Sequence, residues 1–513
     1  MDGRHLVSAT RTPRSVAARL LELAETAPDR NALICIHDQA DAEPVAMAQF
    51  AKDVLELAGK LGDITLAENA SFVLCHPARV DRETATLVLA ALCAEVTLVL
   101  HSPELPTDIL DGALAEGRIG PSIGEAVADL RGYECSLGSI ALWRDQPYER
   151  RPTHFLLTSG STGAPKLTPS WNYADYDPRG IPDVLFRSTG WSETATHLLT
   201  LPVYHIAPCG VLVQSILDGR TLLLGGELDP AKTLEVIERY EVDWLLLTPD
   251  EMGRLLPLAQ DRQESLRSVR TLLHTALPCP PDLKRAWIDL LGPDRVCETY
   301  GGTEGIGMTF LRGREWIERP RSVGRGLLTQ IRIVGDDGTE RAAGELGTVY
   351  MRRLGAGSNS TAGRPWLHRT ADGFVSLGDA GFVDEGGYLY LHDRVAHRID
   401  TAEGPAWLGR TAAVLREHPA LADAECVDGG FDGGITALIV SHGEDADERQ
   451  LHRQLAEFCA ARLSSPQRPR RYLRVPAIPR TVLGKADRVA ITRLAASQAP
   501  SATIPDGFVK NTT

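Results

Sequence analysis

The sequence predicts an α/β protein, with a large N-terminal domain of layered α/β subdomains plus a strand-rich subdomain, and a small mobile C-terminal α+β domain. Over roughly the first 300 residues, stretches with helical spacing of apolar residues alternate with short apolar runs, an order typical of layered α/β domains. After residue 320 the pattern changes to turn-linked strand pairs, and helices return from about residue 393. A chain of 513 residues is too long for one hydrophobic core, which favours two or three domains.

The N-terminal elements follow this alternation. Apolar residues at helical spacing predict helices over 15–24, 50–61 and 86–94, and short apolar runs predict strands over 71–75 and 96–100.

Four later runs are apolar throughout their centres, namely 196–202, 221–226, 242–249 and 269–276. Strands buried on both faces have this composition, so these runs predict a parallel sheet covered by helices.

The last part of the chain combines hairpins and helices. Strands are predicted over 330–338, 347–352 and 387–392, with D-D-G in the first of them as a hairpin turn. Helices are predicted over 410–418 and 451–463. The tail from 497 to 505 is expected to fray.

Charge and cysteine content narrow the class of protein. A formal charge of −14 argues against a nucleic-acid partner, so an anionic ligand would need a local positive site. The nine cysteines are odd in number and never form C-x-x-C, which suits a reduced cytoplasm and small buried side chains rather than metal ligands. The first residues lack the apolar run of a signal peptide, and the sequence has no apolar run of about 18 residues, so no membrane span is expected.

One short loop carries the first chemical signal. The stretch T-S-G-S-T-G-A-P-K (158–166) follows the apolar run H-F-L-L, so it is expected to leave the end of a strand. Gly160 and Gly163 let the backbone approach a ligand, and hydroxyl groups, N–H groups and Lys166 can bind phosphate oxygens. The order does not match the G-x-x-x-x-G-K-[ST] loop of kinases and GTPases. Taken alone, such a run is more often a surface loop.

Three further stretches favour the phosphate-binding interpretation over a plain surface loop. In chain order they are E-T-Y-G-G-T-E (298–304), L-G-D-A-G-F (377–382) and P-R-T-V-L-G-K-A-D-R (479–488). Together with the loop they resemble the motifs of adenylate-forming enzymes, the superfamily of acyl-CoA synthetases, peptide-synthetase adenylation domains and firefly luciferase. The resemblance runs from about residue 15 to 495.

The resemblance implies a role for each motif residue. The residues that would grip the phosphates are Thr158, Ser159, Gly160, Ser161, Thr162, Gly163 and Lys166. The second motif would contact adenine, phosphate and metal: Glu298, Thr299 and Tyr300 bind the nucleotide, Thr303 touches the α-phosphate, and Glu304 holds Mg²⁺. Asp379 would fix the ribose, Arg394 would support it, and Lys485 would bridge the acyl oxygen and the α-phosphate. Taken alone, each charged residue of this set would more often be a solvated side chain on the surface. Their joint occurrence in the order of the family motifs favours the binding roles instead.

A second group would line the acyl pocket, and one of its members, His205, would join Lys485, Glu304 and Thr303 in the catalytic set. By resemblance the pocket residues are Tyr204, His205, Thr275, Ala276, Leu277, Gly301 and Gly302. His205 has two open interpretations, a hydrogen-bonded core histidine or a catalytic side chain where the acyl pocket meets the CoA tunnel. The region 204–207 has no aspartate, so an α-amino acid substrate is not expected, and the chain is expected to act without a fused carrier domain.

The junction between the domains departs from the family pattern G-R-x-D-D-x-I-K-x-x-G. The resemblance implies an N-terminal domain over 1–392, a hinge over 393–399 and a C-terminal domain over 400–513 that carries the catalytic lysine. Arg394 and Ile399 match, whereas Ala396 replaces the charged hinge residue, and His397, Asp400 and the shifted Gly404 also differ.

The predicted function is that of an acyl-CoA synthetase using ATP, Mg²⁺ and CoA, with acyl-adenylate and AMP as intermediate and product. Because the hinge differs, a second hypothesis is an enzyme of one half-reaction, which either makes acyl-adenylate for a carrier protein or converts a supplied adenylate to the CoA thioester. The motifs are also compatible with a luciferase-like oxygenase and with a non-catalytic nucleotide-binding protein. The sequence leaves the acid open among aryl, medium-chain and polycyclic carboxylic acids.

Overall fold

The computed structural model describes the chain in fourteen stretches. These are residues 15–37, 42–68, 72–94, 96–105, 134–137, 154–159, 165–170, 181–191, 195–226, 228–354, 367–429, 434–442, 447–480 and 486–497.

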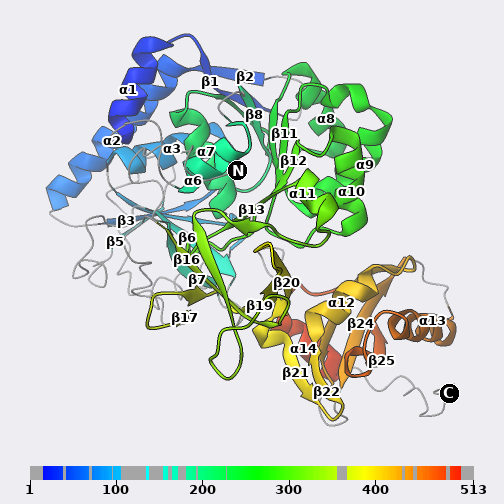
Figure 1. Cartoon of the computed structure of the whole chain (residues 1–513). Helices are drawn as coiled ribbons and strands as arrows, with labels where there is room; N and C mark the ends of the chain where they lie inside the picture. Colours follow the sequence, from blue (N-terminus) through cyan, green and yellow to red (C-terminus); the bar gives the residue numbers. More distant parts are fainter. Residues whose placement is uncertain are drawn as a thin grey trace.

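A nine-stranded sheet forms the centre of the N-terminal part (Figure 1). Its order is β14 (Arg325–Gly326), β13 (Thr309–Arg312), β12 (Val296–Glu298), β11 (Thr271–His274), β10 (Trp244–Leu247), β8 (Thr196–Leu199), β9 (Thr221–Leu224), β1 (Asn31–Ile36) and β2 (Ala42–Ala46). The strands from β12 to β1 run parallel to their neighbours, and β2, β13 and β14 pair antiparallel at the two ends.

Helices cover both faces of this sheet, which explains the fully apolar strands. In β10, Trp244 and Leu246 belong to one core cluster and Leu245 and Leu247 to the other, as the twofold period of a strand requires. The first cluster packs against α1 (Val16–Thr26), α2 (Met47–Glu68), α3 (Arg82–Cys93), α6 (Ile181–Ser188) and α7 (Ile206–Leu217). The second packs against α8 (Pro230–Arg239), α9 (Pro249–Asp261), α10 (Pro281–Leu291) and α11 (Gly313–Glu318).

A smaller sheet has five strands in the order β5 (Glu134–Leu137), β3 (Phe72–Pro77), β4 (Thr97–His101), β6 (His154–Ser159) and β7 (Pro165–Ser170). Its three central strands are parallel, and β5 and β7 pair antiparallel at the edges.

The strand-rich part is an antiparallel sheet, as the turn-linked pattern predicts. Its strands are β15 (Thr329–Val334), β16 (Gly347–Arg353), β17 (His368–Arg369), β18 (Val375–Ser376), β19 (Asp379–Val383) and β20 (Leu389–Arg394). The D-D-G stretch forms the expected turn, with Gly338 at φ +76°. Such a φ favours glycine because a side chain would be strained there.

The C-terminal elements gather in a separate body reached through β19 and β20 (Figure 1). It holds the hairpin β21 (Arg398–Thr401) and β22 (Gly404–Trp407), and the sheet β23 (Leu421–Asp428), β24 (Ile435–Ser441) and β25 (Pro469–Arg474). The helices α12 (Leu408–Arg416) and α13 (Glu448–Ala460) cover one face, and α14 (Arg488–Ser497) covers the other.

The predicted fold class is confirmed: layered α/β units, a strand-rich unit and a small C-terminal α+β unit are all present. The predicted helices and strands match elements of the same type, with ends shifted by a few residues. The tail after Ser497 lies outside the described residues. In the stretches given above, no helix has the length and apolar character needed to cross a membrane.

Candidate active site

The predicted phosphate loop connects two paired strands. Thr158 on β6 lies opposite Lys166 on β7, and Ser159 lies opposite Pro165. The loop therefore does leave the end of a strand, as expected. Gly160, Ser161, Thr162 and Gly163 lie outside the described residues, as do the side chains of Thr158, Ser159 and Lys166.

Asp379, Tyr300 and Arg394 meet, although 79 residues separate the first two in sequence. The Tyr300 hydroxyl donates to Asp379 Oδ2 at 2.6 Å, and Arg394 Nε lies 2.9 Å from Asp379 Oδ1. Asp379 begins β19 and Arg394 ends β20, directly opposite in the register of these two strands. A second Arg394 nitrogen, Nη1, donates to the Leu377 carbonyl at 2.8 Å. The buried Asp379 carboxylate is therefore held by a donor on each oxygen.

Burial and the neighbouring charged groups shift the pKa of the Tyr300 hydroxyl. Burial raises this pKa well above its usual value, and the Asp379 carboxylate raises it further. Glu304 adds to the same effect, and Arg394 opposes it. Tyr300 is thus a neutral hydrogen-bond donor at any physiological pH, and the Glu304 carboxylate lies close enough to influence it.

The Glu304 carboxylate lies close to the backbone of its own loop at Gly302. A Cβ atom at Gly302 would lie 2.6 Å from Glu304 Oε2 and 2.7 Å from Leu377 Cδ1, both closer than real Cβ atoms come. The backbone closes a turn there, since the Gly305 N–H donates to the Gly302 carbonyl at 3.0 Å. Gly301 forms an isolated antiparallel bridge with Met308. The two glycines of the motif therefore let the Glu304 carboxylate fold back over its own loop. Thr303 is partly buried and lies within the turn that this loop forms.

Two threonines of the predicted set use their hydroxyl groups to fix the backbone. Thr275 Oγ1 donates to the Thr299 carbonyl at 2.9 Å, and Thr299 Oγ1 donates to the Thr309 carbonyl at 2.7 Å. Ala276 follows with a φ of +79°, a left-handed conformation that is strained for alanine, and the next residue, Leu277, is 38% exposed. These contacts join the ends of β11, β12 and β13.

Glu298 faces into the protein rather than into the loop. Its Oε2 lies 2.5 Å from Lys284 Nζ, and the two residues are 8% and 1% exposed. His274 lies beside the pair and is fully buried; burial lowers its pKa to about 4, so its ring is neutral. Nothing in the sequence marks Lys284 as a site residue, because a lysine on the amphipathic helix α10 has the pattern of a solvated residue.

His205 lies at the N-terminus of α7, with its ring 4.7 Å from that of Tyr204. Both side chains are only partly buried. This position differs from that of a fully enclosed core histidine such as His197, and the catalytic role of His205 stays a prediction.

The altered hinge is a short turn. Val395–His397 forms a 3₁₀ helix (η5) between β20 and β21, and Ala396 is exposed. Asp393, which no motif marks as a site residue, has a side chain that is only 5% exposed, and its Oδ1 lies 2.9 Å from His397 Nδ1. Lys485 lies outside the described residues.

Comparison with known proteins agrees with this picture. Residues 141–358 match the family model described as AMP-binding enzyme. A 2-succinylbenzoate–CoA ligase of Bacillus licheniformis is 27% identical over 340 residues, which is 65% of this chain and 68% of that protein. The long-chain-fatty-acid–CoA ligase FadD13 of Mycobacterium tuberculosis is 23% identical over 468 residues, 87% of this chain and 85% of that protein.

Two solved structures share the fold over nearly the whole chain. The O-succinylbenzoate coenzyme A synthetase of Bacillus subtilis in complex with AMP has a TM-score of 0.74 at 20% identity, covering 96% of this chain and 100% of that one. ATP-bound MatB of Rhodopseudomonas palustris has a TM-score of 0.74 at 18% identity, covering 95% and 99%. The family match over residues 141–358, the curated relatives and the motif residues that meet at Asp379 together show that this chain is similar to AMP-binding, adenylate-forming enzymes, among them acyl-CoA ligases.

Proposed function

We propose that this protein is an AMP-forming acyl-CoA synthetase. A carboxylate oxygen of the acid attacks the α-phosphorus of ATP and pyrophosphate leaves, which gives an acyl-adenylate. The thiol of CoA then attacks the acyl carbon, AMP leaves with the oxygen that came from the acid, and the thiol proton is released. The observation that carries the proposal is the buried Asp379 carboxylate, fixed by Tyr300 and Arg394 beside Glu304.

The hydrogen-bond acceptor positions left on the Asp379 carboxylate fit the hydroxyl groups of a ribose. An ionised carboxylate accepts about four hydrogen bonds, two on each oxygen. Tyr300 uses one acceptor position on Oδ2 and Arg394 uses one on Oδ1. With these donors from the described residues, one position on each oxygen remains for a pair of neighbouring hydroxyl groups, which is what the 2′ and 3′ positions of ribose present.

The metal and phosphate roles follow the motifs. Glu304 supplies a carboxylate oxygen, the type of ligand that Mg²⁺ prefers, and Mg²⁺ bound there would neutralise charge on the phosphates. The loop 158–166 and Thr303 would hold the phosphate oxygens, and Lys485 would stabilise the charge that grows between the acyl oxygen and the α-phosphate. Tyr204, His205 and residues 275–277 would line the acyl pocket.

The proposed architecture has a domain over 1–392, a hinge over 393–399 and a C-terminal domain over 400–513. The proposed place of action is the cytoplasm, and the cysteine thiols support this proposal. Every cysteine whose side chain the structure describes is free of a disulfide. Burial raises the pKa of Cys209 to about 12, so its thiol stays protonated. The charge of −14 supports small-molecule partners rather than nucleic acid.

Pyrophosphate release tests the proposal. The purified protein is assayed with ATP, Mg²⁺ and a panel of aryl, medium-chain and polycyclic acids, with and without CoA. At least one acid should release pyrophosphate and form a thioester, and Lys485→Ala should lower the rate by roughly 10²–10³-fold. Oxygen consumption is recorded with every active acid, and oxygen uptake without thioester would instead support a luciferase-like oxygenase.

A second candidate function is one half-reaction only. It is favoured by Ala396, which is exposed and uncharged where the family pattern has a charged hinge residue. Two separate assays decide: acid with ATP, and synthetic acyl-adenylate with CoA. Turnover in both assays contradicts this candidate, and turnover in one of them contradicts the complete synthetase. ATP binding without turnover in either assay would point to a non-catalytic relative.

A further inference from the structure

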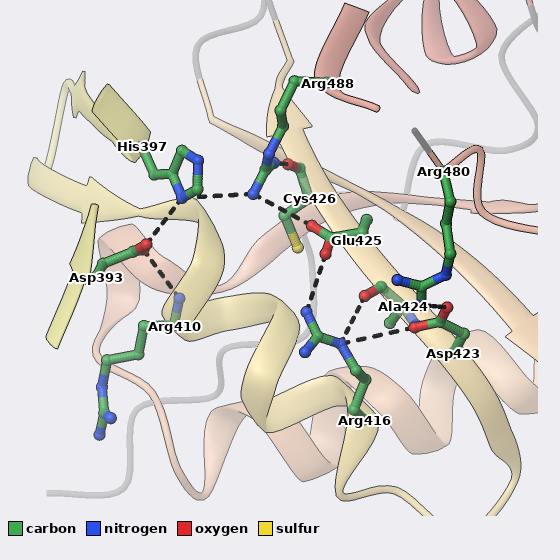
Figure 2. Close-up of polar contacts among 10 residues, drawn as sticks. All are labelled: Asp393, His397, Arg410, Arg416, Asp423, Ala424, Glu425, Cys426, Arg480 and Arg488. Atoms are coloured by element: carbon green, nitrogen blue, oxygen red, sulfur yellow. Dashed lines mark hydrogen bonds and ion pairs between the residues drawn. The ribbon is translucent and has the colours of Figure 1, made fainter. Parts of the chain in front are cut away.

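Two arginines lie at the two ends of the stretch that contains Lys485, and both bind the same strand. Arg480 Nη2 lies 2.7 Å from Asp423 Oδ2 on β23, and the Arg480 backbone forms an isolated bridge with Ala486. Arg488 Nη1 donates to the Cys426 carbonyl at 2.6 Å, and its Nη2 lies 3.2 Å from Glu425 Oε2 (Figure 2). The chain on either side of the segment 481–485 is therefore anchored to β23.

A third arginine ties the same carboxylates to α12. Arg416 Nη2 donates to Glu425 Oε1 at 3.0 Å, and Arg416 Nε donates to the Ala424 carbonyl at 2.9 Å and lies 3.7 Å from Asp423 Oδ1 (Figure 2). Asp423 and Glu425 are two residues apart on one strand, so their side chains share a face. Each carboxylate is thus shared between two guanidinium groups. Glu425 is nearly buried, so the loss of either partner leaves its charge poorly compensated.

The network continues to the hinge. His397 Nδ1 lies 2.9 Å from Asp393 Oδ1 and 3.4 Å from Arg488 Nη2. A carboxylate can only accept, so Nδ1 must carry the proton and donate to Asp393. The same nitrogen cannot also accept from Arg488, and the second contact is therefore a guanidinium packed against the imidazole. His397 thus lies between Asp393 before the hinge and Arg488 after it.

Asp393 fixes the other side of the hinge. Its Oδ2 accepts from the Arg410 backbone N–H at 3.0 Å, and its Oδ1 accepts from the Arg394 N–H at 2.7 Å. A Cβ atom at Gly409 would lie 2.4 Å from Asp393 Oδ1, so only glycine permits this approach. The hydrogen bonds to His397 and to backbone N–H groups outweigh the effect of burial and lower the pKa of Asp393.

We propose that Arg488 is a positioning residue that holds residues 486–488, just after Lys485, on β23 and, through His397 and Asp393, makes this anchoring depend on the hinge. The inference rests on the proposed function, in which Lys485 acts in adenylation. A turn about 394–398 would separate His397 from Asp393 and change the packing against Arg488. The contacts of Arg488 with β23 would then change when the hinge turns. None of the residues in this chain of contacts needs to touch the nucleotide for this to happen.

A double-mutant cycle on the full-length protein tests the proposal. Arg488→Gln and His397→Ala should each lower the kcat of pyrophosphate release at least tenfold and leave KM for ATP within twofold, because the ribose site at Asp379 is untouched. The double variant should be no slower than Arg488→Gln alone, since both changes break one chain of contacts. Arg488→Lys should recover only part of the rate, since an ammonium cannot reach both Glu425 and the Cys426 carbonyl. The matched control is Arg470→Gln, which breaks an exposed pair with Glu403 in the same domain and should keep the wild-type rate.

Hydrogen exchange gives a readout that does not depend on activity. Amides of residues 423–428 and 488–497 should exchange faster in Arg488→Gln and His397→Ala than in the wild type and the Arg470→Gln control. Multiplicative effects in the cycle, or unchanged exchange in His397→Ala, would overturn the coupling. A wild type that releases no pyrophosphate with any acid would contradict the proposed function instead, and exchange would still test the coupling.

Discussion

Replacing Lys284 by methionine should strongly destabilise the N-terminal part. The Lys284 ammonium is 1% exposed and lies 2.5 Å from the Glu298 carboxylate. Methionine fills a similar volume but leaves Glu298 buried without a counter-charge, beside the neutral His274. Breaking a buried pair by removing one partner costs about 3–5 kcal/mol. Lys284→Met should lose that much free energy of unfolding.

Urea unfolding followed by tryptophan fluorescence measures this loss. Trp316 is a local probe, because Lys284 Nζ lies 5.3 Å from the centre of its ring. The double variant Lys284→Met, Glu298→Met removes both charges and should recover most of the stability, since an apolar replacement of a buried pair is often neutral. A loss below about 1 kcal/mol in the single variant, or a double variant no more stable than the single, would refute the reasoning.

The same double variant tests the predicted contact of Glu298 with the nucleotide. If Glu298 acts by supporting the loop from below, KM for ATP should stay within about twofold of the wild type. A tenfold rise in KM at restored stability would show that the carboxylate itself contacts the ligand.

Three further outcomes follow from the structure. Gly302→Ala should slow pyrophosphate release at least tenfold, because the added methyl group would displace the Glu304 carboxylate, 2.6 Å from the Cβ position. Asp379→Asn should lower kcat/KM for ATP by roughly 10²-fold, as expected for a preorganised polar contact, while the exposed Asp372→Asn serves as control. Acid should destabilise the protein through His274: burial lowers its pKa from 6.5 to about 4, so the unfolded chain binds the proton first and stability falls between these values. The loss is about 2 kcal/mol at pH 5, seen as a lower urea midpoint than at pH 7.5.

Each of these outcomes has a clear opposite. Wild-type rates in Gly302→Ala would mean that the loop can relax around a methyl group. Equal effects of Asp379→Asn and its exposed control would remove Asp379 from the ribose site. His274→Asn lacks the buried imidazole and should show a smaller acid loss than the wild type; an identical loss would assign the acid sensitivity to other groups.

The fold was largely predictable because its signals are local. In β10 (W-L-L-L) every residue is apolar and buried, which is typical of a parallel strand covered on both faces. The D-D-G turn and the helices at 15–24 and 410–418 follow from patterns of a few residues.

The site was predictable only where motifs mark it. Tyr300, Asp379 and Arg394 come from separate motifs that were each expected to bind the nucleotide, and the three side chains are in contact, while their roles stay predictions. Lys284 and Asp393 were missed because their roles depend on partners in other elements. Nothing in the sequence around Lys284 distinguishes a buried lysine from a solvated one. The contacts of Asp393 depend on the close approach of α12 at Gly409, which the sequence around Asp393 does not show.

The proposed half-reactions require that one oxygen of the acid ends on AMP. The most direct test is to supply an active carboxylic acid labelled with ¹⁸O in both carboxylate oxygens, together with ATP, Mg²⁺ and CoA, and to weigh the nucleotide product by mass spectrometry. The product should be AMP that carries one ¹⁸O atom, with pyrophosphate free of label. Thioester formation with unlabelled AMP, or with ADP and phosphate as products, would contradict it.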